Sequence, residues 1–147
     1  MNWIIYLLAA GAGAANPAQA AANAELKKTL GQVLSATTFV YLSGLAGMLV
    51  LHAVARQGLP PSEKLAAVRW WAWTGGLLSI AATTAGAAFA QRLGSGVFTG
   101  ISVTAAVVMS LVLDNFGWMG FKEHPATWPR VLGGALMIAG LWITAKF

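Results

Sequence analysis

The chain has 147 residues, of which 58% are hydrophobic and only 9% are charged, and its formal net charge is +5. A soluble domain of this size carries charge on roughly a quarter of its residues, so these charges are too few to cover a water-facing surface. The composition therefore predicts an all-α integral membrane protein, and the absence of cysteine excludes disulfides and thiolate metal sites.

The first predicted transmembrane helix covers about residues 2–25, because no charged residue precedes Glu25. About 20 mostly apolar residues are enough to cross the hydrocarbon of a bilayer. The sequence AQA at 18–20, followed by two further alanines, resembles the cleavage site of a signal peptide. However, the two residues that open the chain include no Lys or Arg, and the apolar run continues past the site. We therefore expect this helix to be retained.

Polar side chains interrupt the second half of this first helix. Asn16, Gln19 and Asn23 are spaced i, i+3 and i+7, which places them on one helix face within about 60°. Pro17 cannot donate a backbone hydrogen bond and should free the carbonyl of Gly13, so we expect a break there. The three amides either line a substrate path or bond neighbouring helices, and the residues alone do not decide between these roles.

The second predicted helix covers about residues 31–56, since no charged residue lies between Lys28 and Arg56. Tyr41 falls near its middle, with Thr37 and Thr38 one turn before it. A buried tyrosine needs a partner for its hydroxyl, so Tyr41 must face protein or a cavity. It is a candidate for the substrate pathway, although a packing role explains it equally well.

Two further helices are predicted over about residues 68–91 and 94–117. In the second of these, Ser102, Ser110 and Asp114 follow one stripe at helical spacing. An acid within a span can bind a cation or carry a proton. Alternatively, Asp114 lies at the interface, where it pairs with Lys122 or caps the turn that follows. The glycines that end the helix within a turn favour this second interpretation.

The last predicted helix covers about residues 127–146 and includes an apolar run of only 15 residues. Thr127 can cap its start, and Pro129 is tolerated in a first turn. The flanking Arg130 and Lys146 can extend their stems to the interface, so the span is adequate. Residues 1–147 are thus expected to form a single transmembrane domain of five helices.

The loops of this five-helix arrangement carry nearly equal positive charge on the two sides of the membrane. One side holds Arg56, Lys64, Arg69, Lys122 and Arg130, and the other holds Lys27, Lys28, Arg92 and Lys146. Orientation follows an excess of Lys and Arg on the cytoplasmic side, so near balance favours insertion in both orientations. An antiparallel pair of chains would form a ten-helix inverted-repeat assembly with its site near the midplane.

Several classes of function find no support in the sequence. No span combines a nucleophile with a base, a central carboxylate or a phosphate-binding loop, so we expect no enzyme and no cofactor. His52 and His124 are too isolated for a metal centre. Basic residues spread over both membrane faces do not favour nucleic acid. Transport of a solute or a purely structural role in the bilayer remains.

An ordered set of motifs resembles the YdcZ-like family, the half-length, five-helix branch of the drug/metabolite transporter superfamily. The motifs are Gly13, Gln19, Asn23 and Leu26 in the first helix, WWAWTGG at 70–76, RLG at 92–94, the pattern ending in FG at 110–117, and GG.LM.AG at 133–140. The resemblance implies a bacterial inner-membrane protein assembled as an antiparallel pair, from one dual-topology chain or from two paired chains. The positions that match are Gln19, Asn23, Ser110, Asp114 and Gly117.

Two functions follow from this resemblance. The first is a transporter for a small metabolite or drug-like solute, acting as an antiparallel dual-topology dimer. The second is a non-transporting membrane subunit, or one half of an obligate heteromeric pair. The family commonly has Gly-Gln in the middle of the fourth helix, where this chain has Ala105 and Ala106. That departure favours the second function.

Overall fold

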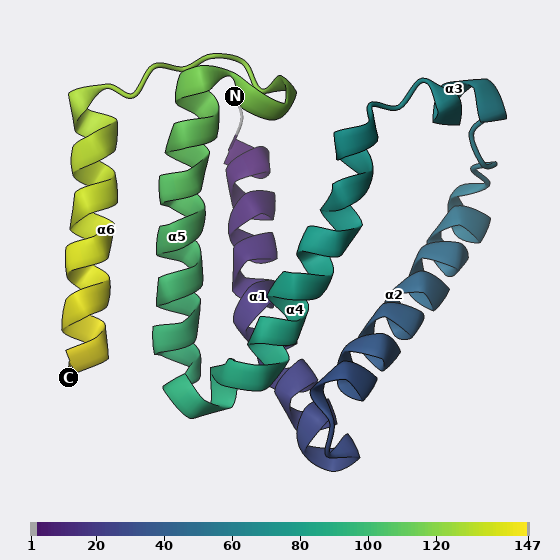
Figure 1. The fold of residues 1–147 in the computed structure, drawn as a ribbon, viewed down its shortest axis with the longest axis horizontal. Helices are drawn as coiled ribbons and strands as arrows, with labels where there is room; N and C mark the ends of the chain where they lie inside the picture. The colour runs from purple at the N-terminus through teal and green to yellow at the C-terminus, as the bar shows by residue number, and fades with distance from the viewer. Residues whose placement is uncertain (1–2, 147) are drawn as a thin grey trace. The chain divides into compact units, whose positions relative to one another are not determined.

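The computed structural model describes residues 3–146, and every regular element in that range is helical (Figure 1). This confirms the predicted all-α class. The elements are α1 (Trp3–Leu30), α2 (Val33–Ala55), α3 (Ser62–Ala66), η1 (Trp70–Trp73), α4 (Thr74–Leu93), α5 (Ser95–Phe116), η2 (Trp118–Gly120) and α6 (Trp128–Lys146).

Three of the described helices, α2, α5 and α6, are long and apolar enough to cross a membrane. Their 23, 22 and 19 residues match a hydrocarbon core about 30 Å thick at about 1.5 Å per residue. Helices α1 and α4 have sufficient length, with 28 and 20 residues, but are rich in alanine, glycine and polar side chains. Their crossing of the membrane stays a prediction.

Helix α1 runs without interruption through Pro17, so the expected break at this residue is wrong. One missing backbone hydrogen bond does not end a helix whose remaining turns are intact. The helix continues to Leu30, five residues beyond the predicted end, and Gly31 then turns the chain with φ +74°. The N–H of Gly31 donates to the carbonyl of Lys27 at 2.9 Å, which closes the last turn.

Helices α1 and α2 pack against each other after this turn. Ala24 on α1 and Ala36 on α2 are both fully buried. Small side chains allow two helix backbones to approach closely, as is typical of helix pairs in membranes. Alanine at these two positions is therefore consistent with a close approach of α1 and α2.

The third predicted span, expected over about residues 68–91, begins later than expected. Residues Trp70–Trp73 form a single 3₁₀ turn, and α4 starts only at Thr74. The hydroxyl of Thr74 donates to the carbonyl of Trp71 at 2.6 Å and so joins the two helical segments.

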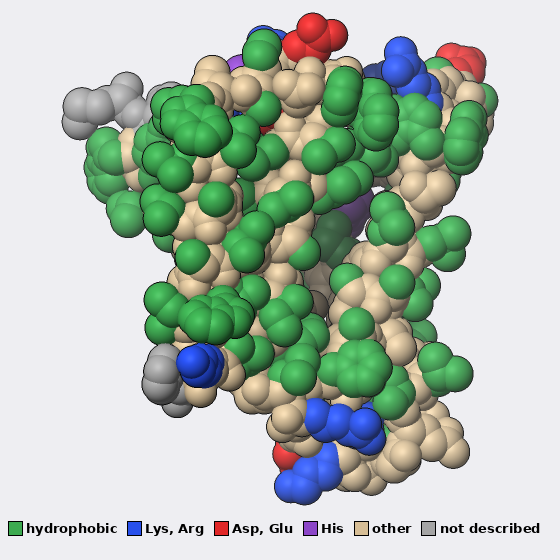
Figure 2. Space-filling view, turned by 60° about the vertical axis from the view of Figure 1, so that its left-hand side comes forward, with side chains coloured by type: hydrophobic (Ala, Val, Ile, Leu, Met, Phe, Trp, Pro, Cys, Tyr) green, Lys and Arg blue, Asp and Glu red, His purple; other side chains and the backbone are tan. Residues whose placement is uncertain are grey.

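Charged side chains gather at helix ends and connections, while hydrophobic side chains cover the helix lengths (Figure 2).

The chain divides into two compact units, one ending at Arg92 and the other beginning at Leu93. In the second unit, α5 and α6 lie side by side in antiparallel directions (Figure 1). A Cβ atom at Gly100 would lie only 2.6 Å from Cδ1 of Leu141, and one at Gly134 would lie 3.4 Å from Cδ1 of Leu111. Glycine thus makes room for leucine at position 100, whereas a Cβ atom at position 134 would make an ordinary van der Waals contact. That the two units belong to one transmembrane domain stays a prediction.

Candidate functional site

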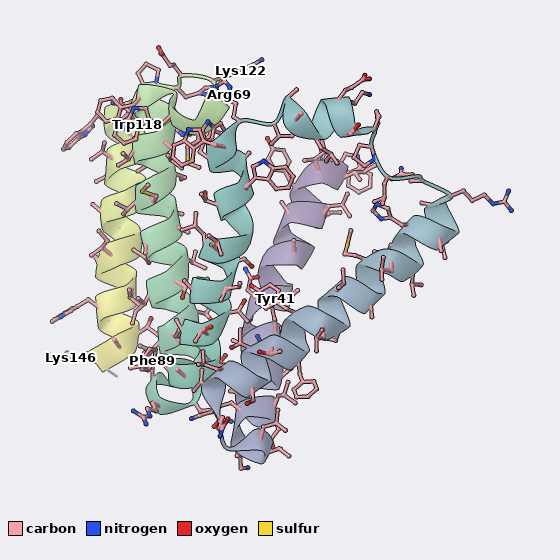
Figure 3. The ribbon with its side chains drawn as sticks, turned by 45° about the vertical axis from the view of Figure 1, so that its right-hand side comes forward. Tyr41, Arg69, Phe89, Trp118, Lys122 and Lys146 are labelled. Atoms are coloured by element: carbon pink, nitrogen blue, oxygen red, sulfur yellow. The ribbon has the colours of Figure 1, made fainter. Side chains whose placement is uncertain are left out.

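A pocket of about 520 Å³ lies between α2 and α4 in the first unit. The two helices converge towards the start of α2 and the end of α4, and Tyr41 lies on the side of α2 that faces α4 (Figure 3). Half of the lining side chains are aliphatic and half carry hydroxyl groups. They are Leu34, Leu42, Leu45, Ile80, Thr37, Thr38, Tyr41 and Thr84.

The hydroxyl of Tyr41 joins α2 to α4. Its oxygen lies 2.7 Å from Oγ of Ser79 and 3.2 Å from Oγ1 of Thr83. Ser79 and Thr83 are four residues apart and therefore share a face of α4. This confirms the expectation that the hydroxyl of Tyr41 needs a partner, and it places Tyr41 at a pocket.

A second hydroxyl pair lies one turn away on α2. Thr37 is only 5% exposed, and its hydroxyl donates to the carbonyl of Val33 at 3.0 Å. Its oxygen also lies 3.3 Å from Oγ1 of Thr84. A hydroxyl has a single proton, so Thr84 must be the donor in this contact. The pocket wall is thus tied together by interhelical hydrogen bonds at two levels.

The polar residues predicted on the first helix do not line this pocket. Asn23 is 6% exposed, whereas Asn16 and Gln19 are exposed. The difference arises because Asn23 lies closer to the turn at Gly31, where α1 packs on α2. The other two lie farther from this turn, towards the amino end of α1. Within residues 3–146, no side-chain hydrogen bond is made by any of these three amides.

Two of the predicted residues of α5 use their hydroxyls within their own helix. Ser102 donates to the carbonyl of Phe98 at 2.9 Å, and Ser110 donates to that of Val107 at 2.8 Å. Both side chains are exposed, and the buried hydroxyl of this helix belongs instead to Thr104. In the second unit the structure therefore does not gather Ser102 and Ser110 into a site.

Asp114 forms an ion pair with Arg130, the first basic residue of α6, at 2.5 Å, and does not pair with Lys122 as one interpretation expected. The two side chains are 24% and 36% exposed. Arg130 also donates to the carbonyl of His124 at 2.8 Å, and the N–H of His124 donates to the carbonyl of Asp114 at 2.8 Å. We call Asp114, His124 and Arg130 the interhelical clamp. It fixes the connection between α5 and α6. That Asp114 lies at the membrane interface stays a prediction.

Sequence reasoning missed the α4 side of the pocket, where Ile80 and Thr84 form the wall. It also missed the partners of Tyr41 on α4, which are Ser79 and Thr83. Their i, i+4 spacing in a helix otherwise rich in alanine and glycine was the available signal. Among the described residues, no three His, Asp or Glu side chains gather in a way that could hold a metal ion.

Three helices able to cross a bilayer, together with a pocket between two helices, are typical of a polytopic membrane protein. Residues 4–143 match the model of the family described as "Putative inner membrane exporter, YdcZ", so the chain belongs to that family. This confirms the resemblance noted in the sequence. Comparison with curated proteins and with solved structures gave no match.

Proposed function

We propose that this protein exports a small metabolite or drug-like solute across the bacterial inner membrane, with the α2–α4 pocket as part of the path. Membership of an exporter family supports transport out of the cell. The pocket is the observation that carries the proposal, because its 520 Å³ lies within the range of about 300–1,000 Å³ typical of small-molecule sites.

We further propose that the working unit is an antiparallel dimer of five-span chains. The charges that flank α1 and α4 support their insertion, since Lys27 and Lys28 lie in the last turn of α1 and Arg92 in that of α4. With five spans, the two sides of the membrane carry five and four basic residues. So small a bias supports insertion in both orientations.

Transport by the purified chain tests the exporter proposal. Liposomes containing the chain are loaded with a small-molecule extract, and the external medium is analysed by mass spectrometry over the first minutes. We expect at least one component to leave at least about tenfold faster than from protein-free liposomes. Release by the chain alone would exclude the non-transporting subunit. If no component leaves faster than from protein-free liposomes, the exporter proposal is wrong.

Reporter fusions test the dual orientation. A carboxyl-terminal reporter active only in the cytoplasm and one active only outside it are expected to give comparable signals. Three additional lysines after Lys146 would add charge to one side, and we expect them to favour a single orientation. A single clean orientation of the unmodified chain, in cells without a paired chain, would exclude the homodimer.

A further inference from the structure

We propose that the α2–α4 pocket selects neutral, largely apolar solutes that carry a hydroxyl group. This inference rests on the proposed function, because it names the class of molecule that the same pocket would pass. It follows from three properties of the pocket wall, namely its lack of charge, its aliphatic surface and the protons of its hydroxyl groups.

The absence of charge argues against ionic solutes. Of the described side chains that line the pocket, none is charged. The two acids of the first unit, Glu25 and Glu63, lie near the end of α1 and in α3, and neither contributes to the wall. An ion held among aliphatic side chains without a counter-charge loses its hydration and gains little in return. A cation or an anion is therefore disfavoured in this pocket.

The threonines of the wall present only acceptors to a guest. Thr37 and Thr38 donate their protons to the carbonyls of Val33 and Leu34 in their own helix, at 3.0 and 2.9 Å. Thr84 donates to Thr37, as the single proton of Thr37 requires. Each of these hydroxyl protons is already donated, so the threonine oxygens can only accept a hydrogen bond from a guest. A guest that donates a hydrogen bond fits this part of the wall.

The Tyr41 cluster, formed by Tyr41, Ser79 and Thr83, has a proton to spare. Its three hydroxyl groups hold three protons but form two contacts, each of which uses one proton. Within the described residues, Ser79 and Thr83 make no other side-chain hydrogen bond. When both donate to Tyr41, the phenolic proton is free to point into the pocket. A guest that accepts a hydrogen bond fits here.

A neutral hydroxyl group meets both needs, because it donates to a threonine oxygen and accepts from Tyr41. Leu34, Leu42, Leu45 and Ile80 provide the apolar contact for the rest of such a molecule. A lipid acyl chain would also match the aliphatic side chains but would satisfy none of the hydroxyl groups. The observations therefore favour a neutral alcohol over a lipid tail.

Binding of three probes of equal size tests this inference. Naphthylethanol, naphthylethylammonium and naphthylacetate are titrated at neutral pH against the full chain in nanodiscs, with binding followed by saturation-transfer NMR. We expect the neutral alcohol to bind at least about tenfold more tightly than either ion. Tyr41→Phe and Thr38→Val should each weaken its binding about fivefold, as expected for one hydrogen bond. Empty nanodiscs correct for partition into lipid.

Two controls separate binding from folding. Tyr41→Phe removes a hydroxyl that joins α2 to α4, so this variant could weaken binding by disturbing the fold. Thr38→Val removes a hydroxyl that bonds only within α2, so it tests the pocket while the hydrogen bonds between α2 and α4 stay intact. Ser43→Ala removes an α2 hydroxyl outside the pocket, which donates to the carbonyl of Val40, and should bind like the unmodified chain.

Three outcomes would overturn the inference: an ion that binds as tightly as the alcohol, two pocket variants that bind normally, or no binding of any probe because lipid fills the pocket. The liposome screen presumes no solute class. Release of a charged component would therefore refute this inference and leave the exporter function standing.

Discussion

Replacing Thr38 with tryptophan is expected to abolish export by the purified chain. Thr38 lines the α2–α4 pocket, and its hydroxyl bonds only within its own helix. The substitution therefore places the largest side chain in the proposed path without removing a bond between helices. We expect the initial rate of release from liposomes to fall at least about tenfold, which corresponds to about 1.4 kcal/mol.

A tryptophan elsewhere on the same helix provides the matched control. Ser43 is exposed, lies outside the pocket, and donates its hydroxyl to the carbonyl of Val40 at 2.8 Å. Ser43→Trp should be tolerated because the position is exposed, so the larger side chain does not have to displace a buried neighbour. Equal rates for the two variants, each verified as folded by circular dichroism, would show that the solute does not pass through this pocket.

Breaking the ion pair of the interhelical clamp is expected to destabilise the second unit. Asp114→Ala or Arg130→Ala leaves one charge unpaired at a partly buried position, with the partners 24% and 36% exposed. We expect each variant to lower the free energy of unfolding by about 1–2 kcal/mol, between the values for exposed and buried pairs. Thermal unfolding in detergent measures the change.

The exchanged pair, Asp114→Arg with Arg130→Asp, distinguishes a clamp from a proton carrier. It restores the attraction, and it also places arginine at the end of α5 and aspartate at the start of α6, where the helix dipoles favour them. We expect most of the lost stability to return. Asp114→Asn should continue to export when the rate is normalised to folded protein. Loss of export with unchanged stability would instead assign the carboxylate a coupling role.

The sequence was sufficient to predict helices but not their partners. The ends of α2, α5 and α6 were predicted to within two residues. Charge-free intervals located the three helices, because lipid excludes charge over a fixed thickness, and cap and glycine signals set the ends of α5 and α6. The need of Tyr41 for a partner was likewise predictable from the cost of burying a phenol. That Ser79 and Thr83 are its partners depends on which helix faces α2, and no local pattern specifies this.

Two other sequence expectations failed for related reasons. Pro17 was expected to break α1, yet the turns on either side hold the helix together. Asp114 pairs with Arg130, sixteen positions away, because the connection brings the ends of α5 and α6 together. Helical spacing also placed Asn16, Gln19 and Asn23 on one face, but only packing near the turn determined which of them is buried.

The side chain of Asn23 shows how the stability of a single chain can differ from its stability when a partner is bound. Its side chain makes no hydrogen bond within residues 3–146, yet no described side-chain nitrogen or oxygen atom is both fully enclosed and unpaired, so the amide can still be reached from outside. In hydrocarbon an amide without a hydrogen bond is costly, whereas an apolar residue at this position would carry no such cost. A hydrogen bond from a neighbouring chain or from a solute would remove that cost, the trade-off found where proteins retain costly residues for binding.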